Sequence, residues 1–248
     1  MPGISVVIIC KNEEKNIAAC LGSVKWCDEI IVIDAFSTDK TQDIVKKFTD
    51  KLFQKEWAGF SEQRKFGLEK CTKDWIFALD ADERCTHELK EEILKLIKDP
   101  AIKENGFFIP RKSFFLDTWI KHSGWYPGYQ MRLFKRSKVK LDNRIIHEKY
   151  EVESPTGKLK SDMLHYTVTS LEEFMSKINK YSTLQAKEKA SKRDVGYFGM
   201  FFRPRLSFFK QYILRLGFLD GTPGLMVAYY DMITQILVNS KIREIKKK

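Results

Sequence analysis

The chain has 248 residues, 43% of them hydrophobic and 31% charged, which is typical of one folded domain of ordinary size with a sizeable core. Its 13 glycines and 7 prolines are too few for a collagen-like chain, and its 13% aromatic content excludes a disordered one. Lys and Arg number 44 against 33 Asp and Glu, and the net charge of +11 indicates a polyanionic partner: nucleic acid, a phosphorylated substrate or an anionic membrane.

The first 110 residues alternate between apolar runs and helical patterns. β-Branched runs at residues 4–9 and 29–33 and an apolar run at 75–79 predict strands. Apolar residues at helical spacing follow these runs, and a further helix is expected from about residue 61 to Leu68. Helix-capping oxygens are expected from Asn12, Ser37, Thr38, Asp39 and Thr86. This order predicts parallel strands with helices on both faces, whose ligands bind beyond the carboxyl ends of the strands.

Acidic residues follow each of these three strands, within residues 10–13 (CKNE), 34–37 (DAFS) and 80–83 (DADE). Asp80 and Asp82 give the sharpest signal, because residues i and i+2 of an extended chain project to the same side and converge on one hard cation. Such oxygen ligands suit Mg²⁺ or Mn²⁺ and leave positions open for diphosphate oxygens. The alternative is that Asp82 or Glu83 only caps the helix after Thr86.

The pattern changes after residue 105. Residues 106–150 contain aromatic segments broken by Gly124, Pro127 and Gly128, which predicts mixed or antiparallel strands with long loops. Helical spacing returns after residue 165, with apolar residues on one face. The chain therefore changes from a sheet-forming part to a helical C-terminal part.

Neither a disulfide framework nor a targeting segment is expected. The five cysteines are odd in number and contain no C-x-x-C pair, which favours reduced thiols in a cytosolic compartment. Residues 4–10 lack a basic flank and a cleavage site, so they predict a buried strand rather than a signal peptide. The apolar stretch 225–238 is interrupted by Asp231 and is shorter than the roughly 20 residues that a membrane-spanning helix needs.

Four motifs in the first 83 residues resemble those of the family 2 glycosyltransferases of GT-A fold. They are residues 6–14 (VVIICKNEE), 31–41 (IVIDAFSTDKT), 63–68 (QRKFGL) and 74–83 (DWIFALDADE). The resemblance implies an α/β, Rossmann-like nucleotide-sugar-binding fold with a mixed central sheet and a C-terminal helical extension. It implies a GT-A catalytic domain at 1–165, divided into a nucleotide-sugar-binding half (1–110) and an acceptor and base half (111–165), followed by a basic amphipathic helical region at 166–248.

The resemblance also implies roles for the matching residues. Glu13 and Asp34 match positions that hold the nucleotide, and the position of Asp34 is at the uracil edge. Arg64 matches a position near the diphosphate. The motif formed by Asp80, Ala81 and Asp82 holds the metal and the sugar nucleotide, with Asp82 as the direct ligand. The alternative for Glu13 is an acid of the first helical turn, favoured by the helix dipole, and for Asp34 it is a turn acid.

An inverting transfer needs a carboxylate that takes the proton of the acceptor hydroxyl. Glu148 matches the family's catalytic position, but the usual pair there is often Glu-Asp and this chain has His147 and Glu148, so Asp142 stays the alternative base. His165 is a candidate further metal ligand or, alternatively, a core or rim histidine. Arg132 is expected to bind the donor phosphates or an anionic acceptor, or else to form a structural ion pair.

Positive charge and aromatic side chains are concentrated in the C-terminal part. Residues 151–248 contain 17 basic and 10 acidic side chains, whereas residues 1–150 contain 27 and 23. Residues 197–210 (YFGMFFRPRLSFFK) interleave basic and aromatic side chains, which is typical of helices at an anionic membrane surface. The alternatives are that they cover the protein's own core or form a dimer contact. Residues 174–181 and 216–224 further resemble bacterial lipopolysaccharide core β-1,4-glucosyltransferases, whose acceptor is a heptose of the lipid-linked inner core. The three glycines of 216–224 also fit a hinge between two helices.

Together these features predict an inverting, metal-dependent glycosyltransferase. Its donor would be a UDP-hexose, with UDP-glucose as the favoured one, and its cofactor would be Mg²⁺ or Mn²⁺. Its acceptor would be a lipid-linked lipopolysaccharide or lipooligosaccharide inner core at the cytoplasmic face of the membrane. The alternatives are transfer to another surface glycan from a different nucleotide sugar, UDP binding without catalysis, and non-catalytic polyanion binding. No nucleic-acid partner is expected, because acids occupy the edge that a phosphate backbone would approach. An oxidoreductase is disfavoured, because no G-x-G-x-x-G follows the first strand.

Overall fold

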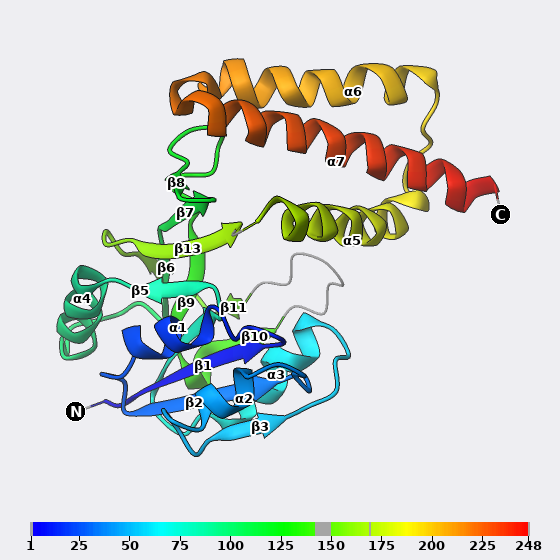
Figure 1. Ribbon diagram of the computed structural model, residues 1–248. Helices are drawn as coiled ribbons and strands as arrows, with labels where there is room; N and C mark the ends of the chain where they lie inside the picture. Colours follow the sequence, from blue (N-terminus) through cyan, green and yellow to red (C-terminus); the bar gives the residue numbers. More distant parts are fainter. Residues whose placement is uncertain (1, 142–149, 169, 248) are drawn as a thin grey trace. The chain divides into compact units, whose positions relative to one another are not determined.

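The computed structural model describes residues 2–141, 150–168 and 170–247, which form two compact units (Figure 1). The first unit consists of Met1–Arg111 and Tyr129–His165, and the second of Lys112–Gly128 and Tyr166–Lys248. Each unit has its own buried apolar clusters, so each is described separately.

A seven-stranded mixed sheet is the centre of the first unit. Its strand order is β12-β6-β9-β4-β1-β2-β3. The strands are β1 (Ile4–Cys10), β2 (Glu29–Asp34), β3 (Leu52–Gln54), β4 (Trp75–Asp80), β6 (Gly106–Ile109), β9 (Gln130–Lys135) and β12 (Thr156–Lys158). Strands β4, β1, β2 and β3 are parallel, whereas β9 is antiparallel to both β4 and β6. The predicted change from parallel to antiparallel pairing along the chain is confirmed.

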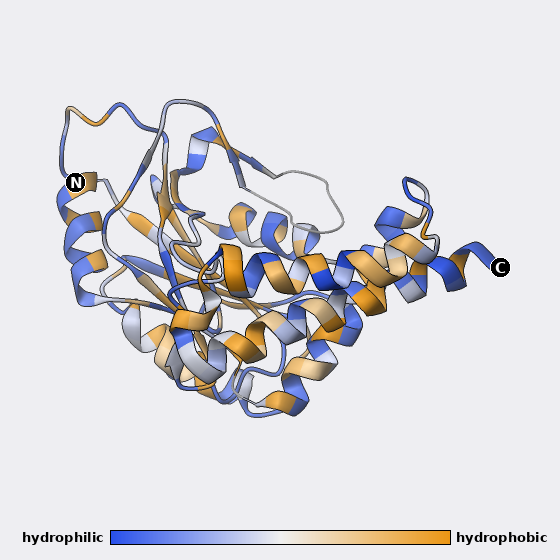
Figure 2. Cartoon of the chain, turned by 90° about the horizontal axis from the view of Figure 1, so that it is seen from above, coloured by the Kyte–Doolittle hydropathy of each residue, from blue (hydrophilic) through white to orange (hydrophobic). Residues whose placement is uncertain are grey.

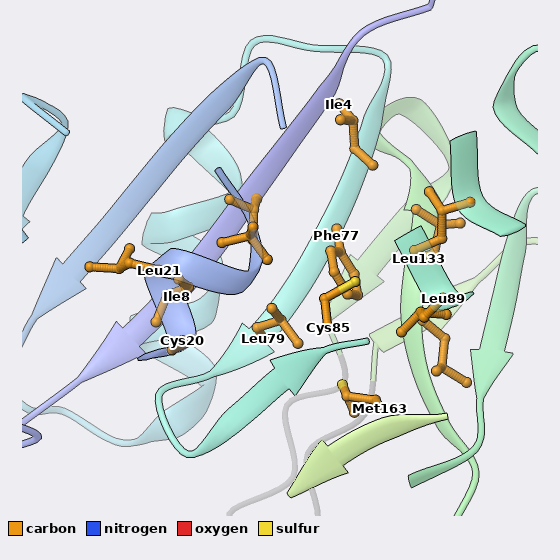
Figure 3. Close-up of a cluster of buried hydrophobic side chains, with 14 of the residues drawn as sticks. Ile4, Ile8, Cys20, Leu21, Phe77, Leu79, Cys85, Leu89, Leu133 and Met163 are labelled. Atoms are coloured by element: carbon orange, nitrogen blue, oxygen red, sulfur yellow. The ribbon is translucent and has the colours of Figure 1, made fainter. Parts of the chain in front are cut away.

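Helices cover both faces of this sheet, as predicted. Residues of α1 (Ile17–Ser23), α2 (Thr41–Val45) and α4 (His87–Ile97) pack with one set of alternating strand side chains, part of which is shown in Figure 3. Helix α3 (Phe60–Lys70) packs with the opposite set. At Gly67 of α3 an added Cβ would lie 2.6 Å from Val7 Cγ2, so the glycine allows the helix that carries Arg64 to approach the sheet closely.

The caps of α1 and α2 differ from the prediction, and the N-cap of α2 is Lys40, with no side-chain cap hydrogen bond. Helix α1 begins at Ile17, because Asn12 adopts a φ of 55° and its Oδ1 instead accepts the Thr38 N–H at 2.8 Å. Thr86, in contrast, caps α4 as expected, since its hydroxyl accepts the Leu89 N–H at 3.1 Å. The cap of α4 is therefore Thr86 itself, and the alternative in which Asp82 or Glu83 only caps this helix is wrong.

Short strands complete the first unit. Strand β5 (Glu83–Cys85) pairs antiparallel with β13 (Met163–Val168), with Glu83 opposite His165 and Cys85 opposite Met163. Strand β10 (Val139–Leu141) follows the 3₁₀ turn Arg136–Lys138 and pairs with β11 (Tyr150–Val152). The β5–β13 pair brings residues far apart in sequence next to the end of β4.

The second unit is mostly helical. Besides the hairpin of β7 (Arg111–Phe115) and β8 (Thr118–Trp119), it contains α5 (Leu171–Ala190), α6 (Tyr197–Phe209) and α7 (Gly221–Lys247), with a π-helical turn at Lys210–Leu214 and a 3₁₀ turn at Gly217–Asp220. Apolar and polar residues alternate along these helices (Figure 2). Among the described residues, no helix combines the length and the apolar character that crossing a membrane requires.

The glycine-rich residues 216–224 form the tight connection between α6 and α7. An added Cβ on Gly224 would lie 2.0 Å from the carbonyl oxygen of Gly217, so only glycine fits there. Asp220 accepts the backbone N–H of His122 at 2.8 Å and contacts the His122 ring at the same distance. The segment therefore connects two helices, which is where the alternative from the sequence places it.

The α/β class, the mixed central sheet and the C-terminal helical extension are all confirmed. Strands β5, β12 and β13 were not predicted, and neither was β3. Strand β3 has only three residues, none of them fully buried, so it lacks the continuous apolar run that marks β1, β2 and β4.

Candidate active site

The carboxyl ends of β1, β2 and β4 meet at one edge of the sheet. In the parallel register Cys10 is opposite Asp34, and Ile9 is opposite Asp80. The acidic residues at the ends of β2 and β4 therefore lie on either side of the end of β1. Ligands of parallel sheets bind at this edge.

Asp34 is completely buried and organises the turn after β2. Its carboxylate accepts hydrogen bonds from the Ser37 N–H at 2.8 Å, from the Ser37 hydroxyl at 2.5 Å and from Gln42 Nε2 at 2.9 Å. Cys10 Sγ lies 3.6 Å from the same carboxylate. These contacts fit the turn-acid alternative, and the direct contact of Asp34 with a nucleobase stays a prediction.

Glu13 is linked to the end of β4 through two side chains. Its Oε2 accepts a hydrogen bond from Asn16 Nδ2 at 2.9 Å, and Asn16 Oδ1 accepts one from Arg84 Nη2 at 3.4 Å. Arg84 Nη1 in turn donates to the carbonyl oxygens of Ala81 and Glu83, both at 2.8 Å. Glu13 and the buried Ala81 thus belong to one connected network around the turn at residues 80–83.

Asp80 is held by two arginines from distant parts of the chain. Arg132 Nη2, on β9, lies 2.5 Å from Asp80 Oδ2, and Arg64 Nη2, on α3, lies 3.3 Å from Asp80 Oδ1. Burial alone would raise the pKa of Asp80, but the charges of Arg132 and Arg64 outweigh it and hold the pKa well below its usual range. Asp80 is therefore ionised at neutral pH, and both predicted arginines contact it.

Glu83 lies beneath this pair and is completely buried. One of its oxygens, Oε2, accepts the Asp80 N–H at 2.9 Å, while the other, Oε1, lies 2.7 Å from Arg132 Nη2. Arg111 Nη1 lies 3.6 Å from Oε1. Three arginines and two carboxylates thus form a compact network at the end of β4.

Asp82 and His165 form the candidate metal-binding pair. His165 Nε2, on β13, lies 3.4 Å from Asp82 Oδ2, and both side chains are largely buried. An imidazole nitrogen and a carboxylate oxygen fit Mn²⁺, and the carboxylate also fits Mg²⁺. Within the described ranges, no group of three or more His, Cys, Asp and Glu side chains is arranged to hold a metal without further ligands. A metal here would need oxygen atoms from the substrate or from water, and Asp80 as its ligand stays a prediction.

The predicted base, Glu148, its alternative Asp142 and the neighbouring His147 lie outside the described residues. The first described residue after them is Tyr150, which is buried and lies with its ring 5.5 Å from the Arg64 guanidinium. Burial raises the pKa of Tyr150 to about 12, so its hydroxyl stays protonated at neutral pH.

Three residues of this network were not predicted from the sequence: Glu83, Arg111 and Tyr150. Glu83 follows the Asp-Ala-Asp motif directly, but its partners Arg132 and Arg111 are distant in sequence, and no local pattern pairs them. A charged residue within an otherwise apolar strand is a signal that could predict such a pair. Such a residue is rarely buried without an opposite charge beside it. Arg132, in β9, meets that description, whereas Glu83 does not, because it shares the three-residue strand β5 with Arg84.

Comparison with known proteins finds a matching family model and similar glycosyltransferases. The model of "Glycosyl transferase family 2" matches residues 5–155, which include the carboxyl ends of β1, β2 and β4. The lipopolysaccharide core biosynthesis glycosyltransferase LpsC of Rhizobium meliloti is 28% identical over 249 residues, covering 96% of this chain and 91% of LpsC. An uncharacterized glycosyltransferase of Rickettsia typhi is 30% identical over 270 residues, covering 100% of this chain and 89% of the relative.

Solved structures also match the chain. A crystal structure of Staphylococcus aureus TarS 1-349 in complex with UDP-GlcNAc has a TM-score of 0.49 at 16% identity, covering 94% of this chain and 81% of that one. The family assignment does not depend on it, because the family model alone covers more than half of the chain. The chain belongs to glycosyl transferase family 2 and is a glycosyltransferase.

Proposed function

We propose that this glycosyltransferase is inverting and metal-dependent and transfers a hexose from a UDP-sugar. Glucose is the hexose that we favour. The proposal is carried by the arrangement at the end of β4, where Asp80 contacts two arginines and Asp82 lies beside His165. Guanidinium groups bind phosphate oxygens, and the carboxylate–imidazole pair supplies ligands for a divalent cation. These contacts support the proposal, because they bring phosphate-binding groups and candidate cation ligands together at one end of β4.

Each side chain has a defined task in this proposal. Arg64 and Arg132 bind and orient the diphosphate of the donor. Asp82 and His165 hold Mg²⁺ or Mn²⁺, which would neutralise charge on the departing UDP when bound. Glu148 takes the proton from the attacking acceptor hydroxyl, on the face of the sugar opposite the diphosphate.

The acceptor we propose is a lipopolysaccharide or lipooligosaccharide inner core. Support comes from LpsC, whose name assigns it to lipopolysaccharide core biosynthesis and which aligns with nearly the whole chain, including the C-terminal helices. The second candidate is another surface glycan, made from a different nucleotide sugar, because at 28% identity the donor and acceptor pockets of two transferases can differ.

We further propose that the enzyme associates peripherally with the cytoplasmic face of the membrane through residues 195–219, named here the aromatic segment. Tyr197, Phe198, Leu206, Leu214 and Leu219 are each more than half exposed. The segment contains four basic residues and no acidic one. Exposed aromatic and apolar side chains among cations suit an interface with anionic lipid, where the lipid-linked acceptor would lie.

A panel of nucleotide sugars tests the central proposal. The full chain is incubated with UDP-glucose, other UDP-hexoses, GDP-sugars and ADP-sugars, with Mn²⁺, with Mg²⁺ or with EDTA, and with a lipid-linked core acceptor. We expect turnover with UDP-glucose that EDTA abolishes. Turnover that prefers GDP- or ADP-sugars would overturn the donor assignment, and full turnover in EDTA would overturn the metal dependence.

A further inference from the structure

We propose that Glu83 is a positioning residue of the donor site, which fixes Arg132 and the Asp80 main chain so that Arg132 presents its guanidinium to the diphosphate. The inference rests on the proposed function for the identity of the ligand. Glu83 itself would not touch the substrate, because it is completely buried beneath Asp80 and Arg132.

The hydrogen bonds of Glu83 require a carboxylate. Oε2 accepts the Asp80 N–H at 2.9 Å, and Oε1 accepts from Arg132 Nη2 at 2.7 Å. Both oxygens therefore face donors, and Arg111 adds positive charge 3.6 Å from Oε1. A glutamine has only one acceptor oxygen, so its NH₂ group would face either the Asp80 N–H or a guanidinium. One of the two contacts must then be lost.

The Arg132 guanidinium is held through one of its nitrogen atoms and has another that can still donate a hydrogen bond. Its Nη2 contacts both Glu83 and Asp80, while its Nε is buried without a hydrogen-bond partner among the described residues. The Nε of Arg111 is in the same state. Buried N–H groups are rarely left unbonded, and an arginine fork binds phosphate through two donors. These two groups are donors left in the network, and under the proposed function the diphosphate would be the anion that this network binds.

Glu83 also has a role that Asp80 does not share. If Asp80 turns toward a cation or a sugar hydroxyl, Glu83 still neutralises Arg132 and keeps it in place. Removing one partner of a buried ion pair leaves an uncompensated charge, which reorients or draws in water. The position of Arg132, and with it the affinity for diphosphate, should therefore depend on the Glu83 charge.

The test compares UDP with uridine, which lacks the phosphates. Binding of each to the full chain is measured by calorimetry with Mn²⁺ present, for wild type and Glu83→Gln. We expect Glu83→Gln to weaken UDP binding about tenfold, the scale of one charge-assisted contact, and to leave uridine binding within twofold of wild type. Equal weakening of both ligands would show a merely structural role, and unchanged UDP binding would overturn the inference.

Glu29 provides a matched control. It is also a buried glutamate paired with a cation, but it begins β2 at the opposite end from Asp34, where it contacts Lys51, Ser5 and Thr72. Glu29→Gln should lower the unfolding temperature and leave the affinity for UDP unchanged. If it weakened UDP binding as much as Glu83→Gln does, the effect would be one of general stability and the inference would fail.

A double mutant separates action through Arg132 from independent action. In an Arg132→Gln background, the additional Glu83→Gln change should weaken UDP binding less than twofold. A further tenfold loss would show that Glu83 acts on the ligand by another route, against the proposal. If Glu83→Gln does not fold, Glu83→Asp replaces it: the charge is kept, but the shorter side chain cannot hold both the Asp80 N–H and Arg132 Nη2, so UDP binding should still weaken more than uridine binding. Absence of UDP binding in wild type would instead overturn the proposed function.

Discussion

The end of β4 and the aromatic segment use charge in opposite ways. At the end of β4, Asp80, Glu83 and Arg132 are closely paired and mostly withdrawn from solvent, so their charges set one another's ionisation and orientation. In residues 195–219, four cations share a sequence with exposed aromatic side chains and no acid. The positive charges that make up the net +11 therefore serve two different kinds of binding. Paired arginines in the first unit suit a small anion, whereas unbalanced cations in the second unit suit an extended anionic surface.

The largest expected effect comes from Asp82, in the paired region. Asp82→Ala should abolish sugar transfer, by about 10³-fold or more, because a carboxylate ligand of the metal is lost. It should also weaken metal-dependent UDP binding, measured by calorimetry with and without Mn²⁺. Asp74→Ala, just before the opposite end of β4, where Asp74 accepts the Gly3 N–H at 3.2 Å, is the control and should keep the activity. Full activity of Asp82→Ala would remove Asp82 from the site.

A second large effect should separate binding from chemistry. Glu148→Gln removes the proposed base and should lower the transfer rate by about 10²- to 10⁴-fold while UDP affinity stays within twofold of wild type. Single-turnover kinetics with saturating donor measures the rate, and calorimetry measures the affinity. Asp142→Asn is the matched variant: if it loses the activity and Glu148→Gln keeps it, the base is Asp142.

The aromatic segment should respond to lipid rather than to nucleotide. Phe198→Ser should weaken binding to vesicles containing anionic lipid about tenfold, the value expected for one aromatic side chain, and 0.5 M salt should weaken it further by screening the arginines. Co-sedimentation with anionic and with neutral vesicles measures both. Phe36→Ser, which changes an aromatic residue that is about half exposed in the first unit, is the control.

Two outcomes of that experiment would break the comparison. Equal binding of wild type and Phe198→Ser would show that the aromatic segment does not bind lipid. A concentration-dependent dimer that Phe198→Ser dissociates, seen by analytical ultracentrifugation without lipid, would assign the exposed face to a second copy of the chain. In either case the +11 charge would need another explanation.

A contact of the site can be predicted from the sequence when the two residues that form it are close in sequence. The strand ends carrying Asp34 and Asp80 follow from apolar runs of known length, because parallel strands end at a common edge. The Thr86 cap is equally local, since its partner Leu89 is three residues away. The Glu83–Arg132 pair joins residues 49 positions apart through an antiparallel strand inserted late in the sheet. No periodicity in the sequence encodes that register, so Glu83 was considered only as a helix cap.

Asp34 illustrates the opposite difficulty. The family resemblance gives it a nucleotide role, whereas in the structure its carboxylate is occupied by Ser37 and Gln42. The sequence shows that an acid is needed at this strand end, but a turn acid and a ligand-binding acid have the same local pattern. Only the number of hydrogen-bond donors around it distinguishes them.

The smallest expected effect tests whether the acids after β4 serve the site or the helix. Thr86→Ala removes the side chain that accepts the Leu89 N–H at 3.1 Å and donates to the Asp162 carbonyl at 2.9 Å. The free energy of unfolding should fall by about 1 kcal/mol, the usual cost of an N-cap, while UDP affinity is unchanged. Chemical denaturation measures the first and calorimetry the second, and Thr86→Ser, which keeps the hydroxyl, should restore most of the stability. If instead Asp82→Ala lowered stability like Thr86→Ala while leaving UDP binding intact, Asp82 would stabilise the fold rather than serve the site, and the paired region would lose its main candidate metal ligand.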